Sequence, residues 1–462
     1  MISCEDEQPI YFIHTKKNMT PIKRNGLAIA SDSICFLLIL TVFYCLTSCK
    51  NQEEAKPANR NTFIHFYGGV GNFRAVAADQ TSDGFILVGD SLATDDFGII
   101  IIKMDQFGNQ VWRKRIPHGT ASAIKTVADG YLIIGDSIKV NLKNRQVSDF
   151  YVHKSRLIKL GLSGSIMNDL SYGDTTISVP GKRVDYSGNA TISGNTLFII
   201  NSVHFANQNI KSMVTALTLG SQVSSSDTLW SETIDLIDRD FVNSKSAHLT
   251  QQGEVIWATT ATQTTQTATL GYVELPVVKQ NSSFTNKGGF GQQDNLFYSA
   301  NDIQPSGGVY GVVGTFQTAT GTNKNISFVR ADLAGNIISG SARFFDGVRS
   351  AGNTPLTDNT VAGGTDDEGS ALAATMDGGY LLAGSSVTST ERGNGGTDIF
   401  IIRIDPFGNM LWNQIIGGNG DESVSTVKQT SDGGFLICGT LDLSSLTSMY
   451  VLKTDSNGEL KN

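Results

Sequence analysis

A short phrase recurs along this chain: a turn that carries Asp-Gly, followed by a run of apolar residues that ends in Gly. Its clearest copies begin at Asp83, Asp129, Asp377 and Asp432. Short apolar runs bounded by Gly and Asp are typical of β-strands joined by tight turns. Gly suits such turns because several turn types need a positive φ. The repeat constrains the fold strongly, since each unit must bury its apolar face against its neighbours.

Two copies show the whole repeating unit. In both, the phrase is followed by a variable loop, an apolar strand, an Asp-x-x-Gly-Asn turn and a strand that carries Trp112 or Trp412. With the strand that precedes the phrase, each unit holds four strands. The second strands, degenerate copies included, are 46 to 71 residues apart and begin at Phe85, Tyr131, Leu197, Val255, Val309, Tyr380 and Phe435.

Four strands per repeat at this period are typical of the blades of a β-propeller. We therefore predict an all-β fold, a seven-bladed β-propeller, with six or eight blades as alternatives. An open β-solenoid fits less well, because the unit is too long and has four strands. The last repeat lacks a fourth strand, and residues 62–69 (TFIHFYGG) resemble the fourth strand at 412–418 (WNQIIGG). The N-terminal strand is thus predicted to complete the last blade, which hides its sheet edge.

The first 48 residues are predicted to be a signal peptide, with Met19 as an alternative start. Lys23 and Arg24 precede an apolar run over residues 34–46, a pattern typical of secretion signals. The following Leu-Thr-Ser-Cys resembles the lipobox of bacterial lipoproteins. That resemblance implies a diacylglycerol on Cys49 and an anchor in the outer membrane, on either the surface or the periplasmic side. Residues 49–61 then form a flexible tether, and residues 62–462 form the propeller.

The composition argues against a nucleic-acid partner. The chain has 35 Lys and Arg against 43 Asp and Glu, a formal net charge of −8, whereas nucleic-acid binding needs a basic stripe. Beyond residue 48, cysteines occur only at positions 49 and 438. We therefore expect no internal disulfide, and we expect Cys438, in an apolar strand, to be a small buried hydrophobe.

Known catalytic patterns are missing from the sequence. The His residues after position 48 are scattered without metal-ligand spacing. There is no G-x-S-x-G motif, no P-loop and no Cys/His pairing suited to catalysis. The sequence therefore predicts a protein that is not an enzyme and that holds no resident cofactor.

One motif invites comparison with a cofactor-binding class. The Asp105–Trp112 segment resembles the Asp-x-x-Gly-x-x-x-Trp signature of quinoprotein-like propellers, and the segment ending at Trp412 matches it too, while Trp230 matches loosely. In that class the Trp packs between blades. The vicinal Cys pair of the class is missing here, so the resemblance implies interblade packing rather than quinone chemistry.

Acidic residues gather where one repeat passes to the next. The clusters include Asp366, Asp367 and Glu368, and also Asp421 and Glu422. Several convergent oxygens could hold Ca²⁺. The alternative is that these carboxylates accept hydrogen bonds from the amides that begin a strand.

Long insertions are all expected on one face of the propeller. Successive strands of a blade are antiparallel, so the tight turns share one face, and the second-to-third and interblade loops share the other. Binding residues usually lie on such loops. The insertion from Asp136 to Ser155 and the next one, Ser202 to Ser212, offer basic and aromatic side chains suited to a protein or glycan ligand: Lys139, Arg145, Phe150, Tyr151, His153, His204 and Phe205. The alternative is a solvated loop whose aromatic residues fold back on the blade.

Over residues 62–462 the repeats resemble the Gly-rich β-propeller lipoproteins of Gram-negative bacteria, within the quinoprotein-like and WD40-like propellers. That resemblance implies a lipid-anchored recognition or scaffold protein that binds protein or glycan partners without catalysis. Two alternatives stay open: a glycoside hydrolase or lyase that uses paired carboxylates, and a periplasmic factor for outer-membrane assembly.

Overall fold

The structure is a computed structural model of the 462-residue chain. Its contacts divide the chain into two units, Met1–Asn59 and Arg60–Asn462. The residues that the structure describes all belong to the second unit. They are residues 61–69, 71–93, 96–140, 151–172, 188–203, 211–220, 228–234, 240–242, 246–264, 269–279, 285–291, 297–317, 324–347, 366–387 and 396–460.

Within these residues the chain forms β-strands and no helix, and the strands pair into six sheets. The first sheet holds β2 (Phe73–Thr81), β3 (Gly84–Ala93), β4 (Asp96–Asp105) and β5 (Gln110–Pro117). The second sheet holds β6 (Gly119–Val127), β7 (Gly130–Val140), β8 (Tyr151–Gly161) and β9 (Ile166–Tyr172). The third sheet holds β10 (Gly188–Ser193), β11 (Thr196–Val203), β12 (Lys211–Thr218) and β13 (Thr228–Ile234).

Two further four-stranded sheets lie at the C-terminal end of the chain. The penultimate sheet holds β25 (Asp367–Ala374), β26 (Tyr380–Val387), β27 (Thr397–Ile404) and β28 (Met410–Ile416). The last sheet holds β29 (Asp421–Gln429), β30 (Phe435–Asp442), β31 (Thr447–Thr454) and, from the other end of the unit, β1 (Phe63–Tyr67).

The remaining strands form one wide sheet of 11 strands. Its members are β14 (Asp240–Val242), β15 (Ala247–Leu249), β16 (Val255–Trp257), β17 (Thr259–Thr264), β18 (Thr269–Val278), β19 (Thr285–Phe290), β20 (Phe297–Tyr298), β21 (Asp302–Ser306), β22 (Val309–Gln317), β23 (Lys324–Ala331) and β24 (Arg343–Phe345). The only pairing between β14–β19 and β20–β24 among the described residues is the parallel contact of Gly271 with Phe297. The wide sheet therefore consists of two antiparallel groups joined at one point.

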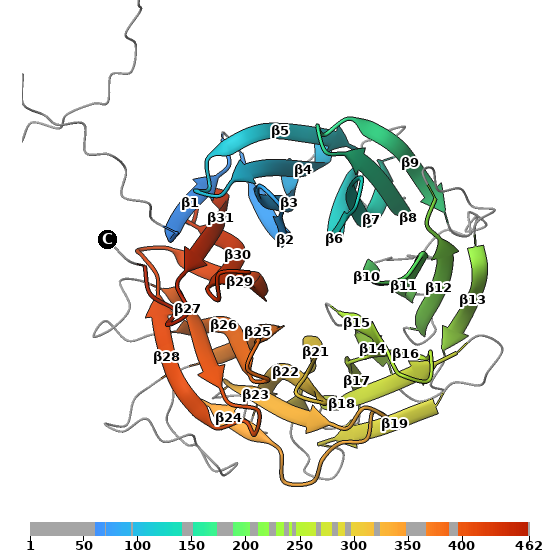
Figure 1. The fold of residues 1–462 in the computed structure, drawn as a ribbon, viewed down its shortest axis with the longest axis vertical. Helices are drawn as coiled ribbons and strands as arrows, with labels where there is room; N and C mark the ends of the chain where they lie inside the picture. Colours follow the sequence, from blue (N-terminus) through green and yellow to red (C-terminus); the bar gives the residue numbers. More distant parts are fainter. Residues whose placement is uncertain are drawn as a thin grey trace, which may run out of the picture. The chain divides into compact units, whose positions relative to one another are not determined.

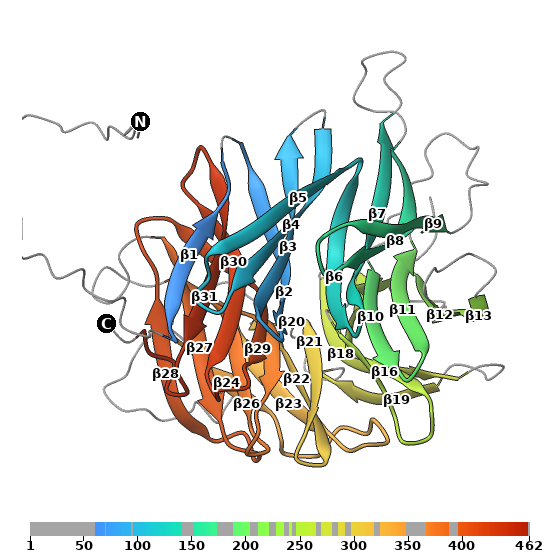
Figure 2. The same cartoon turned by 45° about the horizontal axis from the view of Figure 1, so that its top comes forward.

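The sheets stand around a common centre in chain order, in the manner of a propeller (Figure 1). The first strand of each sheet, such as β2, β6 or β29, lies nearest the centre, and the fourth strand lies at the outside. Figure 2 shows that the strands run between the two ends of this ring. The predicted all-β fold of propeller type is thus confirmed.

The predicted closure by the N-terminal strand is confirmed as well. β1 pairs antiparallel with β31, from Phe63 opposite Lys453 to Tyr67 opposite Met449. The Tyr67 hydroxyl also donates a hydrogen bond of 2.5 Å to the carbonyl of Gly108, in the first sheet. The two ends of the unit therefore share one sheet, and β31 presents no open edge there.

The hydrophobic core is divided among the spaces between neighbouring sheets. One cluster joins Phe73 and Ile100 of the first sheet to Met449 and Val451 of the last sheet. Other clusters join the first sheet to the second, the second to the third, and the penultimate to the last. Because each sheet buries both faces in this way, its middle strands, such as β4 and β30, carry continuous apolar runs rather than an alternating pattern.

The glycine that ends each repeated phrase is required by a bulge in the neighbouring first strand. The register of β2 shifts between Ala75 and Ala77, and the first strands of the second, penultimate and last sheets shift at equivalent positions. A Cβ at Gly89 would lie 2.3 Å from the carbonyl oxygen of Arg74. At Gly135 it would lie 2.1 Å from that of Thr120. A bulge brings the two backbones too close for any side chain.

The Asp of each Asp-Gly turn has a structural role. It forms an ion pair with a Lys or Arg on the third strand of the same sheet. The lysine side chains in these pairs are only 3–9 % exposed. These pairs are Lys103–Asp83 at 2.8 Å, Lys159–Asp129 at 2.7 Å, Lys453–Asp432 at 2.9 Å and Arg403–Asp377. The lysine hydrogen bond lowers the pKa of both Asp83 and Asp129. The recurrence of this Asp therefore reflects the architecture of the repeat.

Candidate functional site

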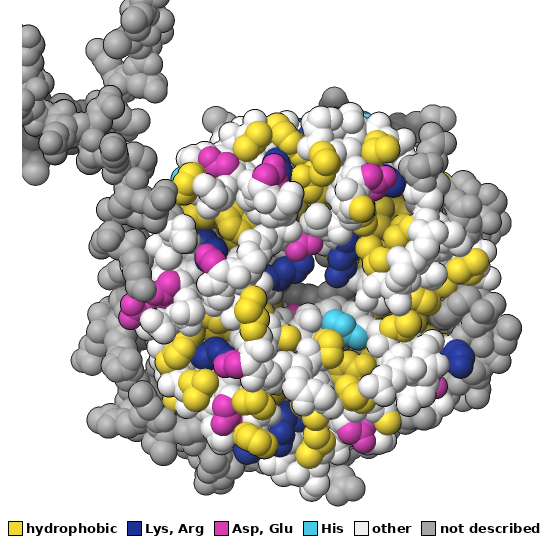
Figure 3. Space-filling model, in the orientation of Figure 1, with side chains coloured by type: hydrophobic (Ala, Val, Ile, Leu, Met, Phe, Trp, Pro, Cys, Tyr) yellow, Lys and Arg dark blue, Asp and Glu magenta, His cyan; other side chains and the backbone are white. Residues whose placement is uncertain are grey.

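The centre of the ring contains a cavity of about 650 Å³. Figure 3 shows it as a hollow in the middle of the viewed face, with Lys or Arg side chains at its edge. Its walls come from the innermost strands β2, β6, β21, β25 and β29, from Ser246, just before β15, and from Asp136 of β7. Small residues such as Ala77, Ala78 and Ala373 line much of it, which is why space remains between the sheets. A volume of this order suits a small organic ligand.

The innermost strands place equivalent residues in one layer around this cavity. Where the repeated phrase is clear, the equivalent residue pairs with the residue three positions before the Gly that ends the phrase, as Lys125 pairs with Leu132 and Lys428 with Leu436. The layer defined by this register, here called the inner layer, consists of Asp79, Lys125, Thr191, His248, Gln304, Ala373 and Lys428. Polar and charged side chains predominate in it.

Asp79 ties three neighbouring sheets together within the inner layer. Its Oδ1 accepts from the Lys428 ammonium at 2.7 Å. Its Oδ2 accepts from the backbone amide of Thr126 at 3.2 Å and from the Thr126 hydroxyl at 3.1 Å. Both carboxylate oxygens of Asp79 are therefore used by the fold.

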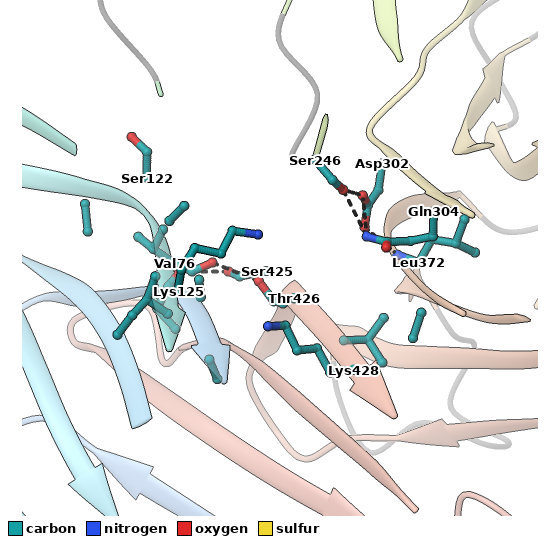
Figure 4. Close-up of a pocket in the computed structure, with 18 of the residues that line it drawn as sticks. Val76, Ser122, Lys125, Ser246, Asp302, Gln304, Leu372, Ser425, Thr426 and Lys428 are labelled. Carbon is teal, nitrogen blue, oxygen red and sulfur yellow. Dashed lines mark hydrogen bonds between the residues drawn. The ribbon is translucent and has the colours of Figure 1, made fainter. Parts of the chain in front are cut away.

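Lys125 projects into the cavity from β6 and is half-buried (Figure 4). Among the described residues it makes no hydrogen bond and no ion pair. Burial by the cavity walls and, after it, the charge of Lys428 lower its pKa to about 8, while Asp79 and Asp302 act in the opposite direction. Near neutral pH the ammonium is mostly protonated, so the cavity holds a cation that the fold does not employ.

His248 is the other titratable group of the inner layer. Its Nε2 lies 2.8 Å from the carbonyl oxygen of Ile303, on the neighbouring strand β21. Burial lowers the pKa of His248 to about 4, against the effect of that hydrogen bond and with a contribution from the charge of Lys125. A neutral imidazole that donates Nε2–H to the carbonyl fits both observations. His248 is therefore a packed, neutral residue of the inner layer at physiological pH.

Asp302, the buried acid on the opposite wall, is also engaged by the fold. Its Oδ2 accepts from the Leu372 amide at 2.8 Å, which joins β21 to β25. Its Oδ1 accepts from the Ile303 amide at 2.8 Å and from the Ser246 hydroxyl. Gln304 donates to Ser246 at 3.0 Å (Figure 4). The carboxylate thus links the inner strands rather than projecting freely into the cavity.

The loop residues predicted to bind ligand lie elsewhere, and one boundary was wrong. The insertion predicted from Asp136 to Ser155 is shorter, because β7 extends to Val140 and β8 begins at Tyr151. Lys139, Tyr151 and His153 are therefore strand residues, paired in register as Lys139 with Val152, Val140 with Tyr151 and Ile138 with His153. The alternating Ile138, Val140 and Val152 favour extension of the hairpin past the predicted end. Arg145, Phe150, His204 and Phe205 lie outside the described residues, as does Cys49.

The first predicted calcium cluster consists of acids with separate partners. Asp366 accepts from the Lys324 amide at 3.1 Å, and Glu368 forms an ion pair with the ammonium of the same lysine. Asp367 is buried and accepts from the Gly347 amide at 2.7 Å. Burial raises the pKa of Asp367, and the neighbouring Asp346 raises it further.

The second cluster behaves in a similar way. Asp421 accepts from the Thr397 amide at 2.8 Å. Glu422 accepts from the Gly418 amide at 3.4 Å. Burial raises the pKa of Glu422 to about 7, with further contributions from the charges of Asp398 and Asp421 and from a hydrogen bond with Asp398. In the part of the chain that the structure describes, no three His, Cys, Asp or Glu side chains are grouped so as to hold a metal ion.

The interblade packing predicted for two tryptophans is confirmed. Trp112 of the first sheet contacts Tyr131 and covers Gly164, both in the second sheet. Trp412 of the penultimate sheet similarly contacts Phe435 and covers Gly458 in the last sheet. The side chain of Trp230 lies outside the described set. Cys438 is fully buried, as predicted, and forms no disulfide with another described residue. The described residues include no helix long and apolar enough to span a bilayer.

Comparisons with known proteins identify no family. No family model matches the chain, and no curated protein is similar to it. The β-propeller domain of the trilobed protease from Pyrococcus furiosus aligns at 9% identity over 85% of this chain and 100% of that chain, with a TM-score of 0.43. Trypanosoma rangeli sialidase aligns at 10% identity over 75% of this chain, with a TM-score of 0.41. The chain spans 56% of the sialidase chain.

A third solved structure is a subtype N10 neuraminidase-like protein of A/little yellow-shouldered bat/Guatemala/060/2010. It aligns at 9% identity over 85% of this chain and 100% of that chain, with a TM-score of 0.37. Likenesses this distant say nothing about what this chain binds. The propeller fold of the chain is defined by its own strand pairing.

Sequence reasoning missed the inner layer, although the sequence contains a signal for it. Lys125 lies four residues before Asp129 of its Asp-Gly turn, and Lys428 lies four residues before Asp432. Asp79 has the same relation to Asp83. Aligning the repeats on the turn and reading this column would have shown two lysines and an acid at the equivalent position of three repeats.

Proposed function

We propose that this protein is a lipid-anchored recognition protein of the bacterial cell envelope that binds its ligand on a rigid β-propeller and does not transform it. The observation that carries the proposal is the chemistry of the central cavity. Asp302 on its wall, and Asp79, which pairs with the lining residue Lys428, are engaged in links between sheets, whereas Lys125 makes no bond to any described residue. Such a wall is suited to holding a ligand by charge and shape.

The propeller is proposed to have seven blades. The wide sheet is counted as two of them, because its two antiparallel groups join only at Gly271 and Phe297 among the described residues. The other five are the four-stranded sheets. On this count the inner layer receives one residue from each blade. Membership of the quinoprotein-like and WD40-like propellers is part of the same proposal, supported by the interblade contacts of Trp112 and Trp412.

Anchoring at the outer membrane is proposed from the sequence around Cys49. The segment after it is polar up to residue 61, and β1 begins at Phe63. A tether of this kind lets a rigid ring stand away from the bilayer. The alternative of a periplasmic assembly factor predicts that protease added to intact cells leaves the protein uncut. Cleavage under those conditions would support display at the surface.

The carboxylate-based hydrolase or lyase remains the second candidate function. It needs two carboxyl groups at a defined separation across a substrate site. The Glu422–Asp398 pair is the best local candidate, because burial raises the pKa of Glu422 to about 7, as a general acid requires. Glu422 is the second residue of β29, however, and does not line the central cavity.

Deletion of residues 141–147 tests whether the long-loop face contributes to recognition. The full-length chain and the deletion variant would be immobilised through the same C-terminal tag and exposed to solubilised outer membrane. We expect the deletion to preserve the urea unfolding midpoint and to reduce captured glycan and protein. Equal capture by the two forms would remove this loop from the proposal.

A further inference from the structure

The chemical class of the ligand can be inferred from the cations of the inner layer. We propose that Lys125 and Lys428 form a binding subsite for an oxyanion, carboxylate or phosphate, carried by a small polar molecule in the central cavity. This inference rests on the proposed function, because it concerns what the same recognition protein holds.

The first argument is the placement of two like charges. Lys125 and Lys428 belong to β6 and β29, on either side of β2, and both extend into the open middle of the cavity (Figure 4). They are close enough for Lys428 to lower the pKa of Lys125. Repulsion between ammonium groups with half-buried side chains disfavours this arrangement. An anion between them would relieve it.

The second argument is the incomplete neutralisation of this charge. Asp79 forms an ion pair with Lys428 only, and its other oxygen is engaged by Thr126. Asp302 is bound by Leu372 and Ser246 on the opposite wall. Lys125 keeps all three of its N–H donors without an acceptor among the described residues. The side chain of Lys428 is still 35% exposed, so it can reach a second acceptor.

The surrounding wall offers polar partners to the rest of the ligand rather than to its oxyanion. Ser122, Ser425 and Thr426 line the cavity beside the lysines, and Ser122 and Ser425 occupy the bulge positions of β6 and β29 (Figure 4). Ser425 donates to the Ala75 carbonyl at 2.7 Å and Thr426 to the Val76 carbonyl at 3.1 Å, which leaves their oxygens as acceptors.

The size of the cavity indicates what kind of molecule carries the oxyanion. About 650 Å³ is more than an isolated inorganic anion fills. The remaining space is lined by serine, threonine and glutamine together with alanine. Hydroxyl groups of the ligand would find partners there, and the alanines leave room for a ring. A monosaccharide-sized acid or phosphate ester matches this combination.

The binding is expected to depend on pH through Lys125. The charged and titratable groups that face it are Lys428 on β29, Asp79 on β2, Asp302 on β21 and His248 on β15. His248 is neutral above pH 4, and the two acids are structural. As the pH rises through about 8, Lys125 loses its proton and the affinity for an oxyanion should fall.

The test is calorimetric titration of the full-length lipidated chain in detergent with three probes: glucuronate, glucose 6-phosphate and glucose. At pH 7 we expect saturable binding of one or both anionic probes, which distinguishes carboxylate from phosphate, and no binding of glucose. Lys125→Gln should weaken the anion by about tenfold or more, as loss of a charged hydrogen bond does. Lys125→Arg should retain binding and remove its decline near pH 8, because arginine does not titrate there.

Lys114→Gln is the matched control, because Lys114 lies on the outer strand β5 and the change removes the same charge. It should alter the affinity by less than about twofold. The proposal is overturned if glucose binds as well as the anions, if neither anion binds the folded protein at millimolar concentration, or if K114Q weakens binding as much as K125Q. If neither anion binds but deletion of residues 141–147 still reduces capture, the recognition function is supported and the oxyanion subsite is refuted.

Discussion

At the scale of single residues, a lysine ammonium has one of two roles in this fold: it stabilises a blade, or it stays available to a ligand. Which role it has depends on whether an acid of the fold pairs with it. Asp129 recurs in the repeat because a buried lysine needs a counter-charge. Lys125 has no such partner among the described residues. A repeated acid in a Gly-rich turn looks like a binding motif in the sequence, yet its ion pair with the third strand shows that it holds the blade together. The lysine four positions earlier carries no repeated motif, and it is the group left available to a ligand.

The ion pair of the turn leads to a stability prediction. Asp129→Asn leaves Lys159, whose side chain is 9% exposed, without a counter-ion. The substitution should lower the free energy of unfolding by about 1–2 kcal/mol. This is less than the cost of breaking a fully buried pair, because Asp129 is partly exposed. Replacing both residues, Asp129→Asn with Lys159→Met, should recover most of the loss. Urea unfolding of the two single variants and the double variant gives the coupling energy. Additive losses would mean that the pair does not interact.

A second residue-scale prediction concerns pH. The pKa of Glu422 is raised from 4.5 to about 7 by burial and by its acidic neighbours, so the folded state binds this proton more tightly than the unfolded state. The resulting stabilisation is complete below pH 4.5 and is lost as the pH rises through 7.

Glu422→Gln keeps the neutral form at every pH. It should therefore flatten the decline in the unfolding midpoint between pH 4.5 and pH 8 and exceed the wild type at pH 8. Glu459→Gln is the matched control, since it makes the same change at an exposed side chain that does not act on Glu422. A decline of equal size in E422Q and in the wild type would assign the pH dependence to other groups.

At the scale of elements, β1 is the piece on which closure of the ring depends. Phe63 pairs with Lys453 as Trp412 pairs with Arg403 and Trp112 with Lys103. Like those tryptophans, Phe63 covers a turn glycine of the next sheet, here Gly108, and contacts Phe85. The N-terminal strand thus reproduces the interblade contact of a fourth strand with a smaller aromatic ring.

Truncating Phe63 should therefore weaken the contact between the last sheet and the first sheet, where β1 closes the ring. Phe63, 9% exposed, packs in the cluster between the first and last sheets, and Phe63→Ala should cost about 3 kcal/mol. Ile64→Ala, on the same strand at a side chain 38% exposed, should cost about 1 kcal/mol or less. Urea unfolding compares the two. Equal losses would show that β1 does not stabilise the ring through this contact.

How far the sequence predicts each element depends on the range of the interactions involved. The repeated phrase identified second strands such as Phe85 and Tyr131, because turn glycines and apolar runs are local signals. The similarity between residues 62–69 and 412–418 predicted the pairing of β1. The extension of β7 to Val140 was missed, since polar residues such as Lys139 interrupt the apolar pattern there. The inner layer was missed because a position on the axis is defined by distant strands that meet, as Lys125 and Lys428 do.

At the scale of the whole molecule, the propeller is a ring that its own N-terminal strand closes, and the proposed tether attaches it to a membrane. The polar groups in its centre come from sheets far apart in the sequence, such as Asp79 and Lys428. Their positions depend on every sheet being in place. A binding site of this kind is rigid, and the binding of its ligand should stabilise the ring as a whole.

The anchoring of the molecule is tested by fractionation of cells. Cys49→Ala should move the protein from the membrane pellet to the soluble fraction and should remove the mass of the acyl chains from the mature protein, because a diacylglycerol is its proposed hold on the bilayer. Cys438→Ala, which changes a buried thiol, should leave the distribution unchanged. Retention of the Cys49→Ala protein in the pellet would refute lipidation as the anchor.

The proposed function requires that this propeller hold its ligand without transforming it. The most direct measurement incubates the full-length chain with a panel of acidic envelope polysaccharides and records retained polysaccharide and newly formed reducing ends in the same samples. We predict retention that Lys125→Gln reduces, with no increase in reducing ends over a protein-free control. Reducing ends that accumulate in proportion to protein concentration, and that disappear in Glu422→Gln, would contradict the proposed function and identify an enzyme.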